Sequence, residues 1–351
     1  MAILHRVGNH ARKRHILVTR VAILLQSLNE LVHCSEREDH VYVAEKKSTE
    51  MVMRCLGAHD VLYVVLPYFN YCGFRRRQEL FVKFVREIQN VKGIRIVVSE
   101  LSGPAPLPSL PVWKHIKNKT NSPVWMKERL INLGVRALPK DWEYIAWIDA
   151  DITFMNPNWV QDTIEALQTN DIVQMFRTAV NLGPNNEAMK IDKGFGYMHA
   201  ESGTPYVKTD KYGHWHPGYA WACTRAAFRA MGDKLLDWAI LGSGDRHMAM
   251  AWIGRVLDSC PGTIHRTYKI MLMEYQYKCR NFAVSYVPGT ILHHWHGRLE
   301  DRKYRERWDI LVRHAFDPIA DITESLELTL GGKRLKKDLE AYFEGRREDS
   351  V

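Results

Sequence analysis

The sequence predicts an α/β fold, a doubly wound mixed sheet flanked by helices with active-site loops in the C-terminal half. Three observations support this. Short apolar runs with β-branched residues at 60–67, 94–100 and 144–148 are typical of strands buried on both faces of a sheet. Helical patterns separate these runs, which is the order of β-α-β units. The second half has shorter segments rich in Gly, His, Trp and Tyr, which indicates loops built around a site.

The helices expected between the strands have amphipathic patterns and are followed by glycine. Residues 77–90 place five apolar side chains on one face, and Gly93 comes soon after. A second helix is expected over 124–133, ended by Gly134, and a third over 247–253. Residues 1–58 are basic and then mixed in charge, with apolar residues at helical spacing, so we expect an appended helix there.

Composition limits the class of protein. The 351 residues are 46% hydrophobic and 25% charged, which excludes a disordered, collagen-like or coiled-coil chain. No apolar run approaches the ~20 residues that span a bilayer, so we expect no membrane span. The N-terminal region lacks a small-residue cleavage site, and the six cysteines are scattered. These features predict a cytoplasmic protein with reduced thiols.

Two carboxylates stand one residue apart where the third strand ends. Asp149 and Asp151, separated by Ala150, point to the same side of an extended chain because side chains alternate. Their hard oxygens suit Mg²⁺ or Mn²⁺, and such a metal can bind a diphosphate. The alternative is a polar turn, but carboxylates beside Trp147 and Phe154 would be costly to bury unless paired or metal-bound.

Three histidines fall within four residues near the end of the chain's aromatic-rich half. In an extended segment His294 and His296 face the same way, and neutral imidazoles suit Mn²⁺ or Zn²⁺. We therefore expect His294 or His296 to be a third metal ligand. His293 points the other way in such a segment and is expected to be a core residue.

Asp245 follows a flexible turn, Gly242-Ser243-Gly244, and leads into a helix. It can be the helix N-cap, which contributes ~1 kcal/mol. It can also be a general base, because a carboxylate at the end of a glycine-rich loop can reach a substrate hydroxyl. The residues favour the two interpretations equally.

Aromatic and turn residues concentrate at 214–221. Aromatic faces bind sugar rings and nucleobases, but the same residues also pack in cores, which is the favoured interpretation for Trp221. The acceptor-binding candidates are Trp215, His216, Gly218, Tyr219 and Trp221.

Charged residues also follow the first two strands. The arginines at 75–77 start a helix, where an anion would meet the helix N-terminus, although a solvated charge run is the alternative. Glu100, at the end of the second strand, is either a loop carboxylate or a hydrogen-bond acceptor for a nucleoside.

Taken in order, these features resemble the GT-A fold, nucleotide-sugar-dependent glycosyltransferases over about residues 59–316. The resemblance implies that Asp149 and Asp151 bind a divalent metal, Mn²⁺ or Mg²⁺, on the donor diphosphate, with His294 or His296 completing the site. It implies a UDP-sugar as the favoured donor. Asp245 takes the place of the catalytic base of inverting members, although that base commonly sits in a Glu-Asp pair and Gly244 precedes it here. The implied donor-binding residues are Pro67, Arg77, Glu100, Lys127, Asp149, Ala150, Asp151 and Lys303.

The resemblance also divides the chain by role. It implies a helical appendage at 1–58, a nucleotide-sugar-binding α/β half at 59–200, an acceptor-binding and catalytic half at 201–316, and a helical tail at 317–351.

A narrower similarity, carried by residues 125–129, 292–298, 302–304 and 342–349, is to virus-encoded members, some of which glycosylate hydroxymethylated pyrimidines in DNA. It implies a DNA acceptor and a place in the host cytoplasm. The net charge of +9 and a pI near 9.2 agree with a polyanionic partner.

Two alternatives remain open for the function. The first is a glycosyltransferase acting on a glycan or a lipid-linked acceptor. The second is a non-catalytic nucleic-acid-binding module with a GT-A-like fold, although a decayed site would have no reason to keep Asp149, Asp151, Asp245, His294 and His296 together.

Overall fold

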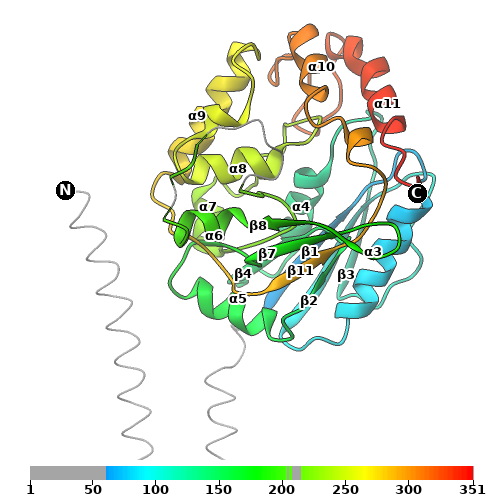
Figure 1. Ribbon diagram of the computed structural model, residues 1–351. Coiled ribbons are helices and arrows are strands. Elements are labelled where there is room, and N and C mark those ends of the chain that lie inside the picture. Colours follow the sequence, from blue (N-terminus) through cyan, green and yellow to red (C-terminus); the bar gives the residue numbers. More distant parts are fainter. Residues whose placement is uncertain (1–60, 204, 208–214, 351) are drawn as a thin grey trace, which may run out of the picture. The chain divides into compact units, whose positions relative to one another are not determined.

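A computed structural model describes residues 61–203, 205–207 and 215–350. The appended helix expected over 1–58 lies outside these residues. The described residues form a mixed α/β arrangement in which helices flank a central mixed sheet (Figure 1), as the sequence predicts.

The central sheet has one reversed strand. Its members are β1 (Leu62–Tyr68), β2 (Ile94–Leu101), β3 (Lys114–Asn118), β4 (Tyr144–Ile148), β6 (Ile172–Gln174), β9 (Ala220–Thr224) and β10 (Val284–Tyr286). Their order in space is β10-β6-β9-β4-β1-β2-β3. Strand β9 pairs antiparallel with β4 and β6, whereas the other neighbours are parallel. The carboxyl ends of β1 and β4 therefore meet at one edge, where ligands bind in sheets of this kind.

The continuous apolar runs form strands buried on both faces. In β1, Val65 packs into one core cluster and Val64 into the other, because successive side chains point to opposite faces. The neighbouring strands follow the same alternation, since Val97 of β2 and Trp147 of β4 lie opposite Val65.

Helices cover both faces. They are α3 (Arg75–Ile88), α4 (Lys127–Arg136), α5 (Trp159–Leu167), α6 (Phe195–Ala200), α7 (Arg225–Ala230), α8 (Gly244–Trp252), α9 (Arg266–Cys279), α10 (Arg307–Arg313) and α11 (Lys336–Glu344), with short 3₁₀ helices η1 (Val256–Ser259), η2 (Glu300–Arg302) and η3 (Gly332–Leu335). Helices α3 and α5 contribute Phe84 and Ile164 to the cluster that holds Val64. Helices α4, α8 and α9 pack in the opposite cluster (Figure 1).

A second, smaller sheet positions two parts of the site. Its strands are β5 (Ile152–Phe154), β7 (Thr178–Leu182), β8 (Ala188–Lys193) and β11 (Thr290–His293), in the order β5-β11-β7-β8. Strand β5 begins directly after Asp151 and pairs antiparallel with β11, so that His293 lies opposite Ile152. This pairing brings the two distant segments together.

One expected helix end differs from the structure. Gly134 was expected to end its helix, but α4 continues to Arg136. A Cβ at position 134 would lie 2.5 Å from Cγ1 of Val65 in β1. This glycine therefore allows close helix–sheet packing, a tertiary requirement that local sequence patterns do not reveal.

The division of the chain into halves at 200 and 316 stays a prediction. The later segments share a core with the earlier ones, since β9 lies between β4 and β6 and since Leu339 and Phe343 of α11 belong to the same cluster as Val65.

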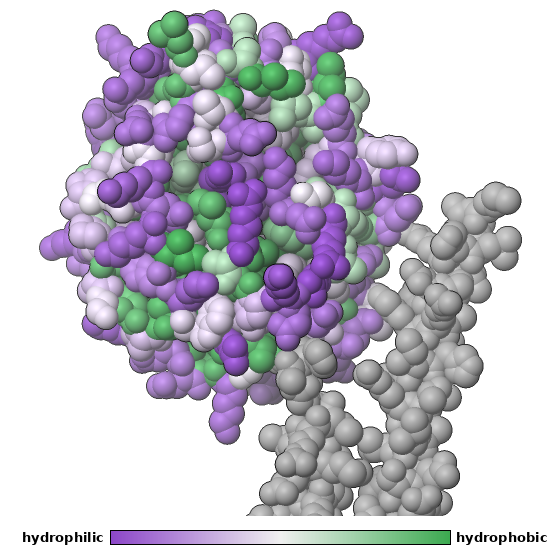
Figure 2. Space-filling view, turned by 180° about the vertical axis from the view of Figure 1, so that it is seen from behind, coloured by the Kyte–Doolittle hydropathy of each residue, from purple (hydrophilic) through white to green (hydrophobic). Residues whose placement is uncertain are grey.

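The surface is largely polar on the face shown in Figure 2, where hydrophilic residues predominate and smaller hydrophobic groups lie between them. Among the described helices, none combines the length and the apolar character needed to cross a membrane. The described cysteines, Cys72, Cys223, Cys260 and Cys279, are free thiols.

Candidate active site

A cavity of about 630 Å³ lies at the carboxyl ends of β1 and β4. Most of the residues singled out from the sequence line it. They are Pro67, Arg77, Lys127, Asp149, Ala150, Asp151, His216, Gly218, Tyr219, Asp245 and His296. The tertiary structure thus gathers side chains from both halves of the chain around one space.

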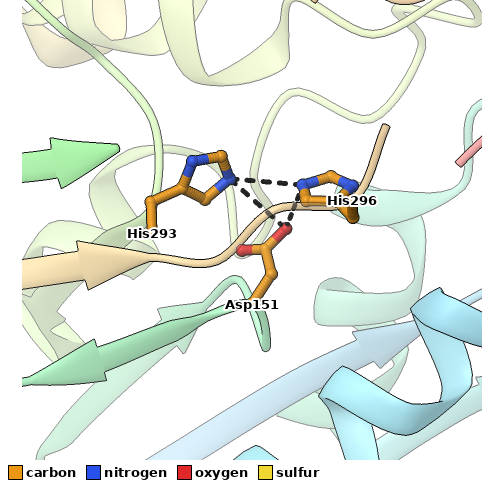
Figure 3. Close-up of side chains that lie close together, drawn as sticks. All are labelled: Asp151, His293 and His296. Carbon is orange, nitrogen blue, oxygen red and sulfur yellow. Dashed lines mark hydrogen bonds and ion pairs between the residues drawn. The ribbon is translucent and has the colours of Figure 1, made fainter. Parts of the chain in front are cut away.

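Asp151, His293 and His296 form a compact cluster on the cavity wall (Figure 3). Oδ2 of Asp151 lies 2.8 Å from Nε2 of His296 and 3.8 Å from Nε2 of His293. The two Nε2 atoms are 3.2 Å apart. One carboxylate and two imidazoles at these separations can hold one divalent cation.

The tautomer of His293 follows from its neighbour Asn181. The Asn181 amide donates to Asp192 at 2.9 Å, so its Oδ1 faces the other way and accepts from the Tyr219 hydroxyl at 2.7 Å. Nδ1 of His293 lies 2.9 Å from the same oxygen and must donate, because an amide oxygen has no proton. The lone pair of His293 is therefore on Nε2, which faces the cluster.

His296 also turns a lone pair to the cluster. Nη2 of Arg302 lies 2.8 Å from Nε2 of His296, and a guanidinium can only donate. Burial, together with the charge of Arg302, lowers the pKa of His296 to about 4, so the ring is neutral at pH 7. Nε2 of His293, Nε2 of His296 and Oδ2 of Asp151 are thus three acceptors that converge.

The surroundings of Asp151 fit a cation site. Its Oδ2 lies 2.8 Å from Nε2 of His296, and these two acceptors repel each other unless a cation lies between them. Its second oxygen, Oδ1, is buried and has no hydrogen-bond partner within the described residues. A divalent cation would satisfy these acceptors.

The structure groups His293, and not His294, with this cluster. Nε2 of His294 lies 2.9 Å from the hydroxyl of Thr153 and 3.5 Å from Nζ of Lys83, on the far side of the strand. Strand β11 ends at His293, so the alternation assumed for an extended segment does not continue to residue 296. His293 and His296 consequently face the same way.

Lys127 forms ion pairs with two other carboxylates predicted from the sequence, those of Asp149 and Asp245, which also line the cavity. Its Nζ lies 2.6 Å from Oδ1 of Asp149 and 2.8 Å from Oδ2 of Asp245. Asp149 is thus paired with a lysine and stands outside the cluster of Asp151 with the two histidines. Its role as a metal ligand stays a prediction.

Asp245 is the second residue of α8, and no side chain caps this helix. The N-cap residue is Ser243, so the helix-cap interpretation of Asp245 does not describe its place. Oδ2 of Asp245 accepts from Lys127, whereas its buried Oδ1 has no hydrogen-bond partner in the described part of the chain. This oxygen is therefore a buried acceptor whose hydrogen-bonding capacity is unused within the described residues.

Glu128 is a buried carboxyl group that sequence analysis did not select. It is 2% exposed, its Oε1 lies against Gly244, and this oxygen has no hydrogen-bond partner within the described residues. Burial, followed by the charge of Asp245, raises the pKa of Glu128 to about 8. At neutral pH this group is mostly protonated.

The pKa values of Asp149 and Lys127 are shifted by the same neighbouring charges. Burial raises the pKa of Asp149 to about 6, against the opposing effect of Lys127. Burial acts to lower the pKa of Lys127, but Asp149, Asp245 and Glu128 outweigh it and raise this pKa. Lys127 is therefore a permanent buried cation.

Arg77 extends the positive charge of the cavity. It stacks 5.5 Å from the ring centre of Phe69 and forms two hydrogen bonds with the buried carboxylate of Glu348, one of them from Nε at 2.6 Å. Arg302 also lines the cavity. Both guanidinium groups line the same cavity as the cluster of Asp151, His293 and His296.

Two predicted donor-binding residues do not line this cavity. The carboxylate of Glu100 accepts from the Leu107 amide at 2.8 Å and contacts Nε2 of His115 at 2.6 Å, so it orders the loop between β2 and β3. Lys303 is exposed and its Nζ lies beside Gly345. The neighbours of Lys303, Arg302 and Tyr304, line the cavity instead.

The predicted acceptor residues separate into two groups. Trp215 packs edge-on against Phe195 and Tyr206 in the core, and Trp221 of β9 is 1% exposed. Neither lines the cavity, because both face the helical layer. His216 and Tyr219 do line it, as a stacked pair with ring centres 4.2 Å apart.

Sequence analysis missed several lining residues. These are Trp125, His293, Tyr304, Trp308, Arg346 and Glu348. The segments at 125–129, 302–304 and 342–349 contributed to the family resemblance, and that was the available signal for most of them.

No protein-family model matches the sequence, and no curated protein matches it. Solved structures similar to it include a mutant Drosophila galactosyltransferase bound to manganese, UDP-Gal and xylobiose (TM-score 0.30, 15% identity), where the match covers 57% of this chain and 62% of that one. A second is glucosyl-3-phosphoglycerate synthase from Mycobacterium tuberculosis with Mg²⁺ and UDP (TM-score 0.36, 12% identity), where the match covers 76% of this chain and 81% of that one. A third is S. aureus TarS with UDP-GlcNAc (TM-score 0.37, 9% identity), where the match covers 82% of this chain and 81% of that one. These likenesses assign no activity to the chain.

Proposed function

We propose that the chain is a metal-dependent glycosyltransferase that moves a sugar from a nucleotide-sugar donor to an acceptor hydroxyl. The observation that carries this proposal is the convergence of Asp151, His293 and His296 on the same cavity as Lys127 and Asp245. A cation site beside guanidinium groups suits a diphosphate, and a carboxylate with one free oxygen suits a hydroxyl. The family resemblance of the sequence implies that the donor is a nucleotide-sugar, with UDP as the favoured nucleotide.

In this proposal Asp151, His293 and His296 hold Mn²⁺ or Mg²⁺, and the two imidazoles favour Mn²⁺. The cation would neutralise the negative charge of the departing diphosphate. Arg77 would bind its phosphate oxygens and hold them in place, as would Arg302 once the cation replaces it at Nε2 of His296.

Asp245 is the proposed base. Its Oδ1 accepts the proton of the acceptor hydroxyl, while Lys127 holds Oδ2 and fixes the orientation of the carboxylate. The hydroxyl oxygen then forms the new bond to the anomeric carbon as the bond from that carbon to the diphosphate breaks. A single displacement of this kind inverts the anomeric configuration, which NMR of the product would test.

Calorimetry tests the donor proposal directly. UDP should bind the wild-type protein with Mn²⁺ and bind much more weakly with EDTA, and a panel of UDP-sugars should raise the melting temperature only with the metal. A ligand at 100 times its dissociation constant stabilises a protein by about 2.7 kcal/mol. If no nucleotide binds with either metal, the transferase proposal fails.

For the acceptor we propose a hydroxymethylated pyrimidine in DNA. The net charge of +9 supports it, as do the exposed Arg298 and Lys303 and the cavity-lining Arg305. Two further arginines of this segment, Arg302 and Arg307, hydrogen-bond to His296 and to Ser243, which leaves them less suited to contact DNA phosphates. The basic run Arg12, Lys13 and Arg14 is also a candidate for phosphate contacts, and it lies outside the described residues.

Transfer of labelled sugar to hydroxymethylcytosine DNA, hydroxymethyluracil DNA and unmodified DNA tests this acceptor. Affinity for the duplex should fall with salt, with a logarithmic slope of about −0.9 per phosphate neutralised. Transfer to none of these DNAs, together with salt-insensitive binding, would favour a glycan or lipid-linked acceptor. Nucleotide-independent DNA binding without transfer to any acceptor would favour a non-catalytic module.

A further inference from the structure

The last residues of the chain return to the cavity. After α11, the segment 346–350 runs beside the start of α3, where the C-terminus lies in Figure 1. The carboxylate of Asp349 accepts hydrogen bonds from the backbone amides of Arg75 at 3.1 Å and Arg76 at 2.7 Å. The indole of Trp295 donates to the Ser350 carbonyl at 3.0 Å. Residues 346–350, called the tail below, are thus fixed to α3 and to the segment 293–296 that holds the histidines.

Gly297 permits this approach. Its φ is +88°, and a Cβ at this position would lie 2.9 Å from the carbonyl oxygen of Arg347 and 3.0 Å from Cα of Glu348. A larger residue would force the tail away from the residue that follows the metal-binding histidine.

Glu348 is the innermost residue of the tail and is 1% exposed. Its Oε1 accepts from Nε of Arg346 at 2.7 Å, and both of its oxygens accept from Arg77. Burial acts to raise the pKa of Glu348, but Arg77 and Arg346 outweigh it, so the pKa is lowered and the group is ionised at pH 7.

The same carboxylate faces the metal cluster from behind. Oε2 of Glu348 lies 3.9 Å from Nδ1 of His296. Because Arg302 donates to Nε2, the proton of neutral His296 is on Nδ1, on the side of Glu348. This distance is within ion-pair range but beyond a hydrogen bond, so the carboxylate acts on the imidazole through its charge: it favours the proton on Nδ1 and makes Nε2 a stronger ligand.

We propose that Glu348 is a positioning residue that orients His296 toward the metal and Arg77 toward the diphosphate, so that the tail completes the site. The inference rests on the proposed function for the identity of the site, but its test uses metal affinity and needs no sugar transfer. If Glu348 only anchored the tail, its loss would change the melting temperature and leave the affinity of the folded protein for metal unchanged.

The test is Mn²⁺ binding to the full chain, followed by calorimetry and by EPR, for Glu348→Gln and for the wild type. Loss of a carboxylate behind a metal-binding histidine typically weakens metal affinity by about 10- to 100-fold, and we expect a change in this range. Glu344→Gln is the matched control, since Glu344 is exposed at the end of the adjoining helix and should bind Mn²⁺ like the wild type. A Glu348→Gln protein that folds and binds Mn²⁺ within twofold of the wild type overturns the inference.

Two further measurements keep the outcome clear. If Glu348→Gln does not fold, Glu348→Asp keeps the charge but withdraws the carboxylate, and it should weaken Mn²⁺ binding by several-fold; unchanged affinity overturns the inference. With saturating Mn²⁺, UDP affinity of Glu348→Gln should also fall, because Arg77 loses its partner. A wild type that binds Mn²⁺ but no nucleotide would refute the proposed function, while the comparison of metal affinities still decides the role of Glu348.

Discussion

Two clusters of polar and charged side chains line one cavity and differ in where their positive charge lies. In the cluster of Asp151, His293 and His296, the ligand atoms of the three side chains face one another. The guanidinium of Arg302 lies at the edge of this cluster. The cluster of Lys127, Asp149 and Asp245 carries its own cation at its centre. The first cluster therefore offers a converging set of acceptors to a cation from solution, whereas the second already holds a lysine between its two carboxylates.

This difference predicts which of the two carboxylates, Asp149 or Asp151, is a metal ligand. The sequence treats Asp149 and Asp151 as an equivalent pair, but only Asp151 lies in the cluster with the histidines. Asp149 is neutralised by Lys127. We therefore expect the two positions to respond differently to the same substitution.

The largest effect is expected for Asp151→Asn, which removes a charged ligand. Mn²⁺ affinity should fall by more than about 100-fold, since loss of an outer partner alone costs 10- to 100-fold. Asp149→Asn should cost less. Calorimetry would measure both, with the exposed Asp141→Asn as the control. Equal losses for Asp149→Asn and Asp151→Asn would show that both aspartates bind the metal.

Next in size is the effect of Asp245→Asn on turnover. We expect sugar transfer to slow by about 10²-fold while donor affinity is retained, because an amide cannot take the proton of the acceptor. Single-turnover rates and UDP binding with Mn²⁺ would separate the two quantities. Turnover close to that of the wild type would return Asp245 to a structural partner of Lys127.

A comparison of adjacent histidines sharpens the metal cluster. His293→Gln should weaken Mn²⁺ binding by at least about 10-fold, whereas His294→Gln should change it less than twofold, because His294 contacts Thr153 and Lys83. EPR titration of Mn²⁺ measures both variants. The reverse result would support the pairing of His294 with His296 expected from the sequence.

The remaining effect is on stability rather than on metal binding or turnover, and it concerns Glu128. Its pKa is raised from 4.5 to about 8 in the folded protein, so its contribution to stability is fully present below pH 4.5 and is lost as the pH rises through 8. Within that window the loss is at most roughly 1.4 kcal/mol per pH unit. Glu128→Gln should remove this part of the pH dependence, and denaturant unfolding between pH 5 and 9 would measure it. An identical pH profile for Glu128→Gln and the wild type would mean that Glu128 is ionised in the folded state.

Apolar runs alone predict three strands of the central sheet, β1, β2 and β4, and the general place of the site. The run 144–148 matches β4, and the carboxylates that follow it line the cavity. Apolar runs and alternation are local properties, because burial on both faces of a strand leaves a continuous apolar pattern. A polar group at the end of such a strand is costly unless it has a role. These rules need no knowledge of distant neighbours.

Only the tertiary structure decided which side chains meet. The pairing of β5 with β11 selects His293, and the end of β11 turns His294 away. The core position that the sequence favours for Trp221 is found in the structure, whereas the burial of Trp215 follows from its packing against Phe195 and Tyr206. Glu348 reaches Arg77 across 271 positions of the chain. Long-range partners depend on strand pairing and on the return of the tail, and no local periodicity records either of them.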